Sequence, residues 1–232
     1  MSDDLSTTML DYLVETYRLS KLTEDPDGYV STSALADLLD VSAPAVNRMI
    51  TKLKDTGMLI HEPYQGIKLT TDGERHTLMK LRRQRIAEAF LVTVMGFGWH
   101  EIYGEADLMS NVINEVLTER MLEMAGNPTY CPHGEPIPTK EGVIVEINDQ
   151  LLTKEKIGGE YVITRVRTRE SDRLEYIAAL GLVPGARLQL IHAAPFDGPL
   201  QLKLGEEYRI VGHNLASFIR VQAVESSEEA QG

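Results

Sequence analysis

The sequence has little cysteine, few aromatic residues and a shortage of basic residues. Its 232 residues include one cysteine and one tryptophan, and aromatic residues make up 6%. A single cysteine excludes an intrachain disulfide and fits a reducing, cytoplasmic setting. Lys and Arg number 23 against 35 Asp and Glu, which gives a formal net charge of −12 at pH 7. Because nonspecific DNA binding depends on phosphate neutralisation, this charge argues against a protein that coats nucleic acid indiscriminately.

Long apolar runs and catalytic motifs are missing as well. No segment approaches the roughly 20 apolar residues that span a bilayer, and the acidic start has no apolar signal core. We therefore expect a cytoplasmic protein without a membrane partner. The sequence has no glycine-rich nucleotide loop, nucleophile elbow or HExxH motif, and its carboxylates form no recognisable catalytic pair, so no enzyme is expected.

One stretch, residues 42–54, contains no acidic residue although the chain is acidic. An apolar stripe with helical spacing predicts a helix with one dry face. Ser42 is expected to cap this helix, and Pro44 is tolerated in a first turn. The stripe consists of Val46, Met49, Ile50 and Leu53, and the opposite, small, polar and basic face of Ala45, Asn47, Arg48, Thr51 and Lys52. Such a helix suits the groove of DNA.

The surrounding pattern predicts a winged helix-turn-helix domain over residues 1–75. Helices over residues 8–20 and from about residue 32 to 39 precede the basic helix, and two short strands follow it as a hairpin, or wing. Thr71 and Glu74 match a capping box that starts the next helix. A second basic run, residues 80–85, lies within that helix and adds to the local positive charge that a DNA reader needs.

The rest of the chain predicts a helical domain and a small β-domain. Helices from about 71 to 95 and 105 to 125 are rich in apolar residues, which predicts a homodimer interface within a domain spanning 76–145. Residues 146–157 are expected to be a linker. Five short β-like runs predict a small barrel over 158–225, and the polar tail 226–232 is expected to be disordered.

This order resembles the diphtheria-toxin-repressor family of metal-dependent transcriptional regulators over nearly the full length. The motifs that carry the resemblance are Ser42-Ala43-Pro44-Ala45-Val46, Leu69-Thr70-Thr71-Asp72-Gly73, Arg85-Ile86-Ala87-Glu88, Glu105-Ala106-Asp107, Cys131-Pro-His-Gly-Glu-Pro-Ile-Pro138 and Leu180-Gly-Leu-Val-Pro-Gly185. The Cys-Pro-His-Gly loop is the most specific of them. The resemblance implies a mainly α multidomain fold: a winged helix-turn-helix, a helical dimerisation domain and a C-terminal SH3-like barrel similar to FeoA.

For DNA binding, the resemblance implies contacts from the basic helix and the wing. Ser42 would bind phosphate or base, Pro44 would pack on a thymine methyl and Arg48 would reach a base edge, where bidentate pairing with guanine adds about 1–3 kcal/mol of discrimination. The expected DNA-binding residues are Ser42, Pro44, Ala45, Asn47, Arg48, Thr51, Lys52 and Lys68.

For metal binding, the sequence departs from the family pattern because no family histidine ligand is present. Histidine positions fall on Gln84, Tyr103 and Asn111, and a glutamate position falls on Ser110. The remaining candidate ligands are Asp11, Glu88, Asp107 and Asn111, with a contribution from Glu170 of the barrel. The Cys131 and His133 pair could be half a zinc site, but the resemblance favours a structural loop.

Three interpretations of the metal site stay open. The chain binds a hard cation such as Mn through the remaining oxygen ligands. Alternatively, the site is vestigial and hydrogen bonds, or an arginine such as Arg173, replace the ion. In the third, the register slips and nearby His100, Glu101, Glu105 or Glu115 serve instead.

We therefore predict a homodimeric repressor that binds a palindromic operator and responds to Mn or Fe if the altered site still binds them. One alternative is a family member that binds DNA independently of metal. Another is a non-DNA interaction module that uses the barrel. No protein partner beyond a second copy is implied.

Overall fold

A computed structural model describes residues 5–22 and 27–224. The predicted disordered tail, 226–232, lies outside these ranges. Within them, no helix is long and apolar enough to cross a membrane. The described residues form two compact units: residues 5–22 and 27–84 with 110–113 and 138–144, and residues 85–109 with 114–137 and 145–224.

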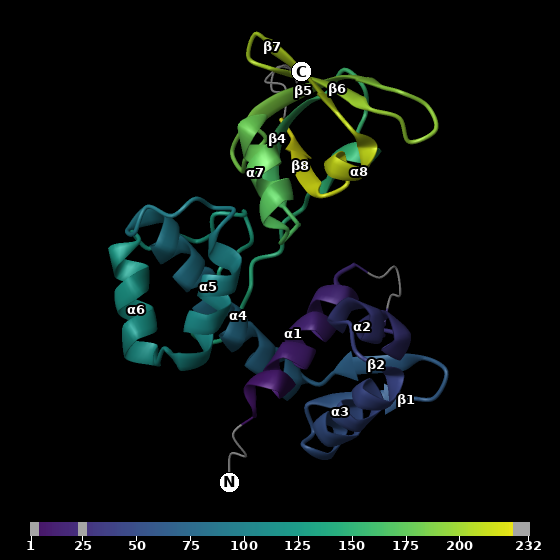
Figure 1. Cartoon of the computed structure of the whole chain (residues 1–232), viewed down its shortest axis with the longest axis vertical. Coiled ribbons are helices and arrows are strands. Elements are labelled where there is room, and N and C mark those ends of the chain that lie inside the picture. The colour runs from purple at the N-terminus through teal and green to yellow at the C-terminus, as the bar shows by residue number, and fades with distance from the viewer. Residues whose placement is uncertain (1–4, 23–26, 225–232) are drawn as a thin grey trace, which may run out of the picture. The chain divides into compact units, whose positions relative to one another are not determined.

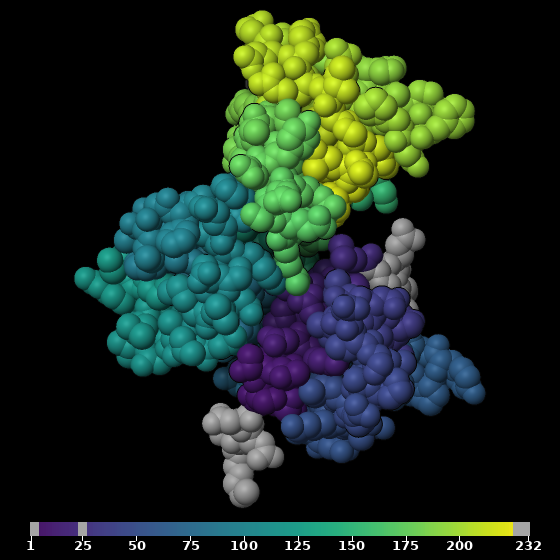
Figure 2. All heavy atoms as spheres, viewed as in Figure 1, coloured from purple at the N-terminus to yellow at the C-terminus, as the bar shows by residue number. Residues whose placement is uncertain are grey.

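The N-terminal part has the predicted winged helix-turn-helix order (Figure 1). Its elements are helices α1 (Thr7–Ser20), α2 (Thr32–Leu39) and α3 (Ala43–Asp55) and strands β1 (Leu59–Glu62) and β2 (Gly66–Leu69). The two strands pair antiparallel, and the hairpin that they form is the wing. The space-filling view shows these helices closely packed on one another (Figure 2).

One small core fixes the orientation of α3. Leu13 from α1, Leu35 from α2 and Ile50 from α3 are almost fully buried and belong to one apolar cluster with Ile67 of the wing. Ser31 caps α2, since its hydroxyl accepts a hydrogen bond from the Ala34 amide at 3.1 Å. The stripe of α3 therefore faces the core, and its polar face is left on the surface.

The middle of the chain is helical, with two corrections to the predicted boundaries. It contains α4 (Thr71–Thr93), α5 (Ile102–Val112) and α6 (Glu115–Met124). The single helix predicted over 105–125 is wrong: the chain breaks before Asn114, whose side chain caps α6 by accepting from the Leu117 amide at 3.0 Å.

The predicted capping box of α4 is also shifted by one residue. Thr70, not Thr71, accepts a hydrogen bond from the Gly73 amide, at 3.1 Å. Gly73 belongs to the motif that follows the wing, and a Cβ at this position would overlap the carbonyl oxygen of Met58. Close approach of Met58, the residue before β1, to the start of α4 therefore requires glycine here.

The C-terminal part is a six-stranded antiparallel sheet with the order β3-β8-β4-β5-β6-β7. The strands are β3 (Gln150–Leu151), β4 (Glu160–Val166), β5 (Arg187–Ala193), β6 (Leu200–Leu204), β7 (Glu207–Val211) and β8 (Ile219–Ala223). All five predicted strands are present. The sheet is open among the described residues, because β3 and β7 form its two edges rather than closing a barrel.

Short helices complete this domain (Figure 1). They are η1 (Leu152–Lys154), α7 (Ser171–Ala179) and α8 (His213–Ala216). Leu152, Leu174 and Ala216 of these helices share one core with the sheet. Residues 150–154, which the sequence assigned to a linker, thus belong to the sheet and its core.

Candidate nucleic-acid interface and metal-ligand clusters

The outer face of α3 consists of the residues predicted to read DNA. Its inner residues Val46, Ile50 and Leu53 are buried. The exposed ones are Ser42, Pro44, Asn47, Arg48, Thr51 and Lys52, and Ala45 is half-buried. Exposure of small, amide and basic side chains along one helical face fits the requirements of major-groove contact.

Two local details shape this face. Ser42 occupies the N-cap position of α3 as predicted, but its exposed side chain makes no capping hydrogen bond. The Thr51 hydroxyl donates to the Asn47 carbonyl oxygen at 2.9 Å within the helix. Amides at a helix N-terminus attract phosphate, which supports an approach of DNA at this end.

In the wing, Lys68 is half-buried on β2. Its Nζ lies 5.6 Å from the centre of the Tyr29 ring, a distance suited to a cation–π contact. The ring supports the lysine beside the helix-turn-helix, within the same unit as α3.

The second basic run does not supply positive charge to a DNA surface. Lys80, Arg82 and Arg85 of α4 are 1%, 4% and 8% exposed. Arg82 donates to the Pro138 carbonyl oxygen at 2.7 Å, and Arg83 Nε donates to the Ser110 carbonyl oxygen at 3.0 Å. The prediction that residues 80–85 concentrate charge for DNA is therefore wrong, because these side chains bind other parts of the chain.

One predicted metal-ligand position is bonded to a lysine. Lys80 Nζ donates to Ser110 Oγ at 2.7 Å and to Asn111 Oδ1. Both acceptors lie in the last turn of α5, where the resemblance expects metal ligands. The oxygen of Asn111 is thus already bonded to a lysine amino group, and these residues do not fit a divalent ion.

Glu88, another predicted ligand, belongs to a second buried cluster with Cys131 and His133. The carboxylate, thiol and imidazole ligand atoms all lie within 4.8 Å of one another. His133 Nδ1 is 3.5 Å from Glu88 Oε2, and its other ring nitrogen, Nε2, is 2.8 Å from the Trp99 carbonyl oxygen. A histidine held by a backbone carbonyl through its second nitrogen is common among metal ligands, so this donor set fits a transition-metal ion.

Burial and mutual contacts within the cluster shift the pKa values of Glu88 and Cys131. Burial opposes ionisation of Glu88, but the hydrogen bond and charge of His133 outweigh it and lower the pKa of the carboxyl. Burial raises the pKa of the Cys131 thiol well above its ordinary value, and the neighbouring Glu88 carboxylate adds to the rise. A thiol with a pKa this strongly raised is protonated at neutral pH unless a cation stabilises its thiolate.

The remaining predicted ligands, Asp11, Asp107 and Glu170, belong to no group of three metal-ligating side chains in the described part of the chain. Asp11 on α1 and Asp107 on α5 are half-buried. Glu170 and Arg173 of the sheet domain form an ion pair at 2.9 Å with each other, and the Arg173 guanidinium lies 4.2 Å from the Phe218 ring centre. Arg173 therefore has partners within its own domain.

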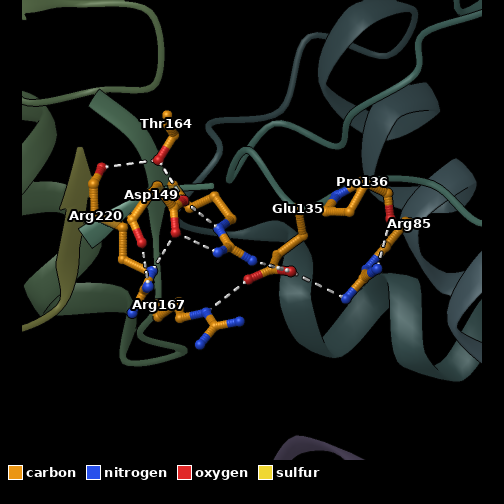
Figure 3. A network of polar contacts seen from close by, with 8 residues as sticks. Arg85, Glu135, Pro136, Asp149, Thr164, Arg167 and Arg220 are labelled. Carbon is orange, nitrogen blue, oxygen red and sulfur yellow. Dashed lines mark hydrogen bonds and ion pairs between the residues drawn. The ribbon is translucent and has the colours of Figure 1, made fainter. Parts of the chain in front are cut away.

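A charge network connects the Cys-Pro-His-Gly loop to the sheet domain (Figure 3). The Glu135 carboxylate bonds Arg85 at 3.3 Å on one side and Arg167 at 3.0 Å on the other. Arg165 lies between Glu135 and Asp149, at 3.5 and 2.6 Å. Gly134 approaches β4 so closely that a Cβ would overlap the Thr164 carbonyl oxygen. The loop is thus fixed by packing and by charge.

Sequence reasoning missed the roles of Lys80 and of the pair Cys131 and His133. The signal for the pair was present, since a Cys-x-His motif has ligand spacing, but its third partner lies far away in the sequence on α4. Lys80 gave no signal of its own, because a basic run in an acidic chain looks like a surface feature.

The fold and the exposed face of α3 define a winged-helix DNA-binding regulator with a helical domain and a small sheet domain. Family models agree along the chain. Residues 4–67 match the iron dependent repressor N-terminal DNA binding domain, 70–139 the iron dependent repressor metal binding and dimerisation domain, and 150–223 the FeoA domain. The chain belongs to the iron-dependent repressor family, as its resemblance to the diphtheria-toxin repressors predicted.

Individual relatives extend over nearly the whole chain. The iron-dependent repressor IdeR of Mycobacterium leprae is 26% identical, over 97% of this chain and 100% of the relative. The IdeR of Mycobacterium bovis is 29% identical, over 82% and 87%. Among solved structures, a manganese-dependent transcriptional repressor in complex with manganese has a TM-score of 0.85 and 27% identity, with 93% of this chain and 100% of that chain covered.

Proposed function

We propose that this chain is a cytoplasmic, homodimeric repressor that reads a palindromic operator through α3. The observation that supports this most directly is the exposed face of α3, which presents polar and basic side chains on a helix whose opposite face is buried. Arg48 reads a base edge, Pro44 packs against a thymine methyl, and Thr51 and Lys52 contact phosphates. Lys68 adds a phosphate contact from the wing.

A second copy of the chain is the proposed occupant of the apolar surface on α5 and α6. The residues are large, apolar and at least half exposed: Leu108, Val116, Leu117 and Met124, at 66%, 77%, 51% and 50%. Clusters of this kind mark association surfaces. A two-fold dimer places two α3 helices in successive major grooves, which matches a palindrome with half-sites about one helical turn apart.

For the metal response of the family, we propose Glu88, Cys131 and His133 as the ligands. Three buried ligand atoms converge there, and a divalent ion balances the charges of a carboxylate and a thiolate. The thiolate favours Fe²⁺ or Zn²⁺ over Mn²⁺, a harder ion. When bound, the ion supplies positive charge between α4 and the Cys-Pro-His-Gly loop.

The only tryptophan offers a direct test of both proposals. The Trp99 ring centre is 5.3 Å from that of His133, so Co²⁺ bound at the cluster should quench its fluorescence. Full-length protein is titrated with Co²⁺ and then with an operator selected from random duplexes. Quenching that is lost in His133→Ala and kept in Arg120→Ala supports the metal cluster, and failure to retain any duplex contradicts the DNA-binding proposal independently.

A further inference from the structure

Lys80 is a buried lysine in a place where a metal ion was expected. It lies in the third turn of α4, is 1% exposed, and belongs to the matched metal binding and dimerisation domain. Lysines are rarely buried to this degree unless paired. Its amino group donates to Ser110 Oγ and Asn111 Oδ1, both of which are neutral oxygen acceptors on α5.

A second contact shows that α4 holds the end of α5 with two cations. Arg83, one turn after Lys80, donates through Nε to the Ser110 carbonyl oxygen at 3.0 Å. This carbonyl is among the last four of α5, which ends at Val112 and leaves such groups without helical partners. Positive charge is favoured at a helix C-terminus, where the helix dipole is negative.

We propose that Lys80 is a built-in cation that replaces a metal ion at the contact between α4 and α5. It supplies what an ion would supply there, a positive charge that binds oxygen atoms of α5. It differs in that it is covalently attached, so the contact does not depend on metal concentration. An ion at the same oxygens would have to displace a buried ammonium and would be repelled by it.

A bound ion at this contact would both hold α5 to α4 and respond to metal concentration, whereas Lys80 does only the first. The contact of α4 with Ser110 and Asn111 is permanent. Response to metal is left to ligands elsewhere, such as the Glu88 cluster. The proposal about Lys80 stands on its own contacts and does not rest on that cluster.

The test uses full-length Cys131→Ser, which removes one ligand of the other cluster. This variant is titrated with Mn²⁺, and separately with Zn²⁺, in a calorimeter. We expect no binding of either ion that a further Asn111→Ala substitution would abolish. A combined variant adds three substitutions to Cys131→Ser. Lys80→Ala removes the internal cation, and Ser110→Glu and Asn111→His introduce a carboxylate and an imidazole ligand. This variant, if circular dichroism shows it folded, should gain one bound ion per chain.

Two further variants keep the test decisive if the combined variant fails to fold. Lys80→Met removes the amino group and is expected to lower the melting temperature by several degrees, whereas Lys154→Ala, at an exposed lysine, should not. The proposal is overturned if Cys131→Ser binds a divalent ion that Asn111→Ala abolishes, because the lysine would then yield its place to metal. It is also overturned if Lys80→Met leaves the melting temperature unchanged.

Discussion

Two basic segments of this acidic chain differ in the exposure of their side chains. On α3, Arg48 and Lys52 are exposed beside small polar residues. On α4, Lys80, Arg82 and Arg85 are buried and donate to oxygen atoms of other segments. A local excess of positive charge therefore identifies a DNA-contacting surface only when an apolar stripe orients the charges outward. The charges of α4 instead organise the helical domain from within.

The largest effect on stability is expected from Arg85→Ala. Arg85 donates to the Pro136 carbonyl oxygen at 2.5 Å and to Glu135, so its removal leaves the carbonyl without this donor and takes one of three arginines from Glu135. We expect a loss of about 3 kcal/mol in the free energy of unfolding, measured by urea denaturation with Trp99 fluorescence.

Arg120→Ala is the matched control, because its ion pair with Glu123 is solvent-exposed, with side-chain exposures of 69% and 60%. Such a pair contributes about 0–1 kcal/mol. Equal effects of the two substitutions would show that the cations of α4 are no more structural than those on the surface.

An effect on DNA binding without an effect on stability is expected from Arg48→Ala. The side chain is exposed, so unfolding should change by less than about 0.5 kcal/mol. Loss of a base contact should cost about 1–3 kcal/mol of discrimination at one base pair of each half-site. Competition binding with single-base variants of the selected operator measures this. An unchanged sequence preference would remove Arg48 from the reading surface.

A smaller, pH-dependent effect is expected from Glu135→Gln. Burial opposes ionisation of Glu135, but the charges of Arg85, Arg167 and Arg165 outweigh it and lower the pKa of the carboxyl. A lowered folded-state pKa stabilises the protein above the unfolded value, about 4.3, and this contribution is lost as pH falls through the folded value. The difference in stability between wild type and variant should therefore be full near pH 6 and shrink below about pH 4. A difference that stays constant over this range would rule out the charge network as its source.

Much of the fold was predictable because local patterns agree with tertiary packing. The stripe of Val46, Ile50 and Leu53 predicted the orientation of α3, and alternating apolar residues predicted five strands. The capping contacts were less predictable, since they depend on how the chain enters each helix: Ser42 stands at the N-cap of α3 without a side-chain hydrogen bond, and Thr70 rather than Thr71 accepts at the start of α4. The break at Asn114 was hidden because apolar residues flank it on both sides, Val112 and Ile113 before it and Val116 and Leu117 after it.

The internal clusters were not predictable in the same way. Glu88 was assigned as a ligand by resemblance, but its meeting with His133 depends on how the loop after α6 returns to α4. Lys80 bonds residues about 30 positions away, a distance that no local pattern encodes. Long-range polar pairing is set by the assembled fold, and the sequence shows only the side chains available for it.

The most direct measurement is the salt dependence of operator binding for wild type, Lys52→Ala and Lys80→Met. Each phosphate contact contributes about 0.9 to the slope of log K against log salt. We predict that Lys52→Ala reduces the slope by about this amount, while folded Lys80→Met keeps the wild-type slope. A reduced slope for Lys80→Met with an unchanged slope for Lys52→Ala would contradict the account, because the basic run of α4, not the face of α3, would then contact DNA.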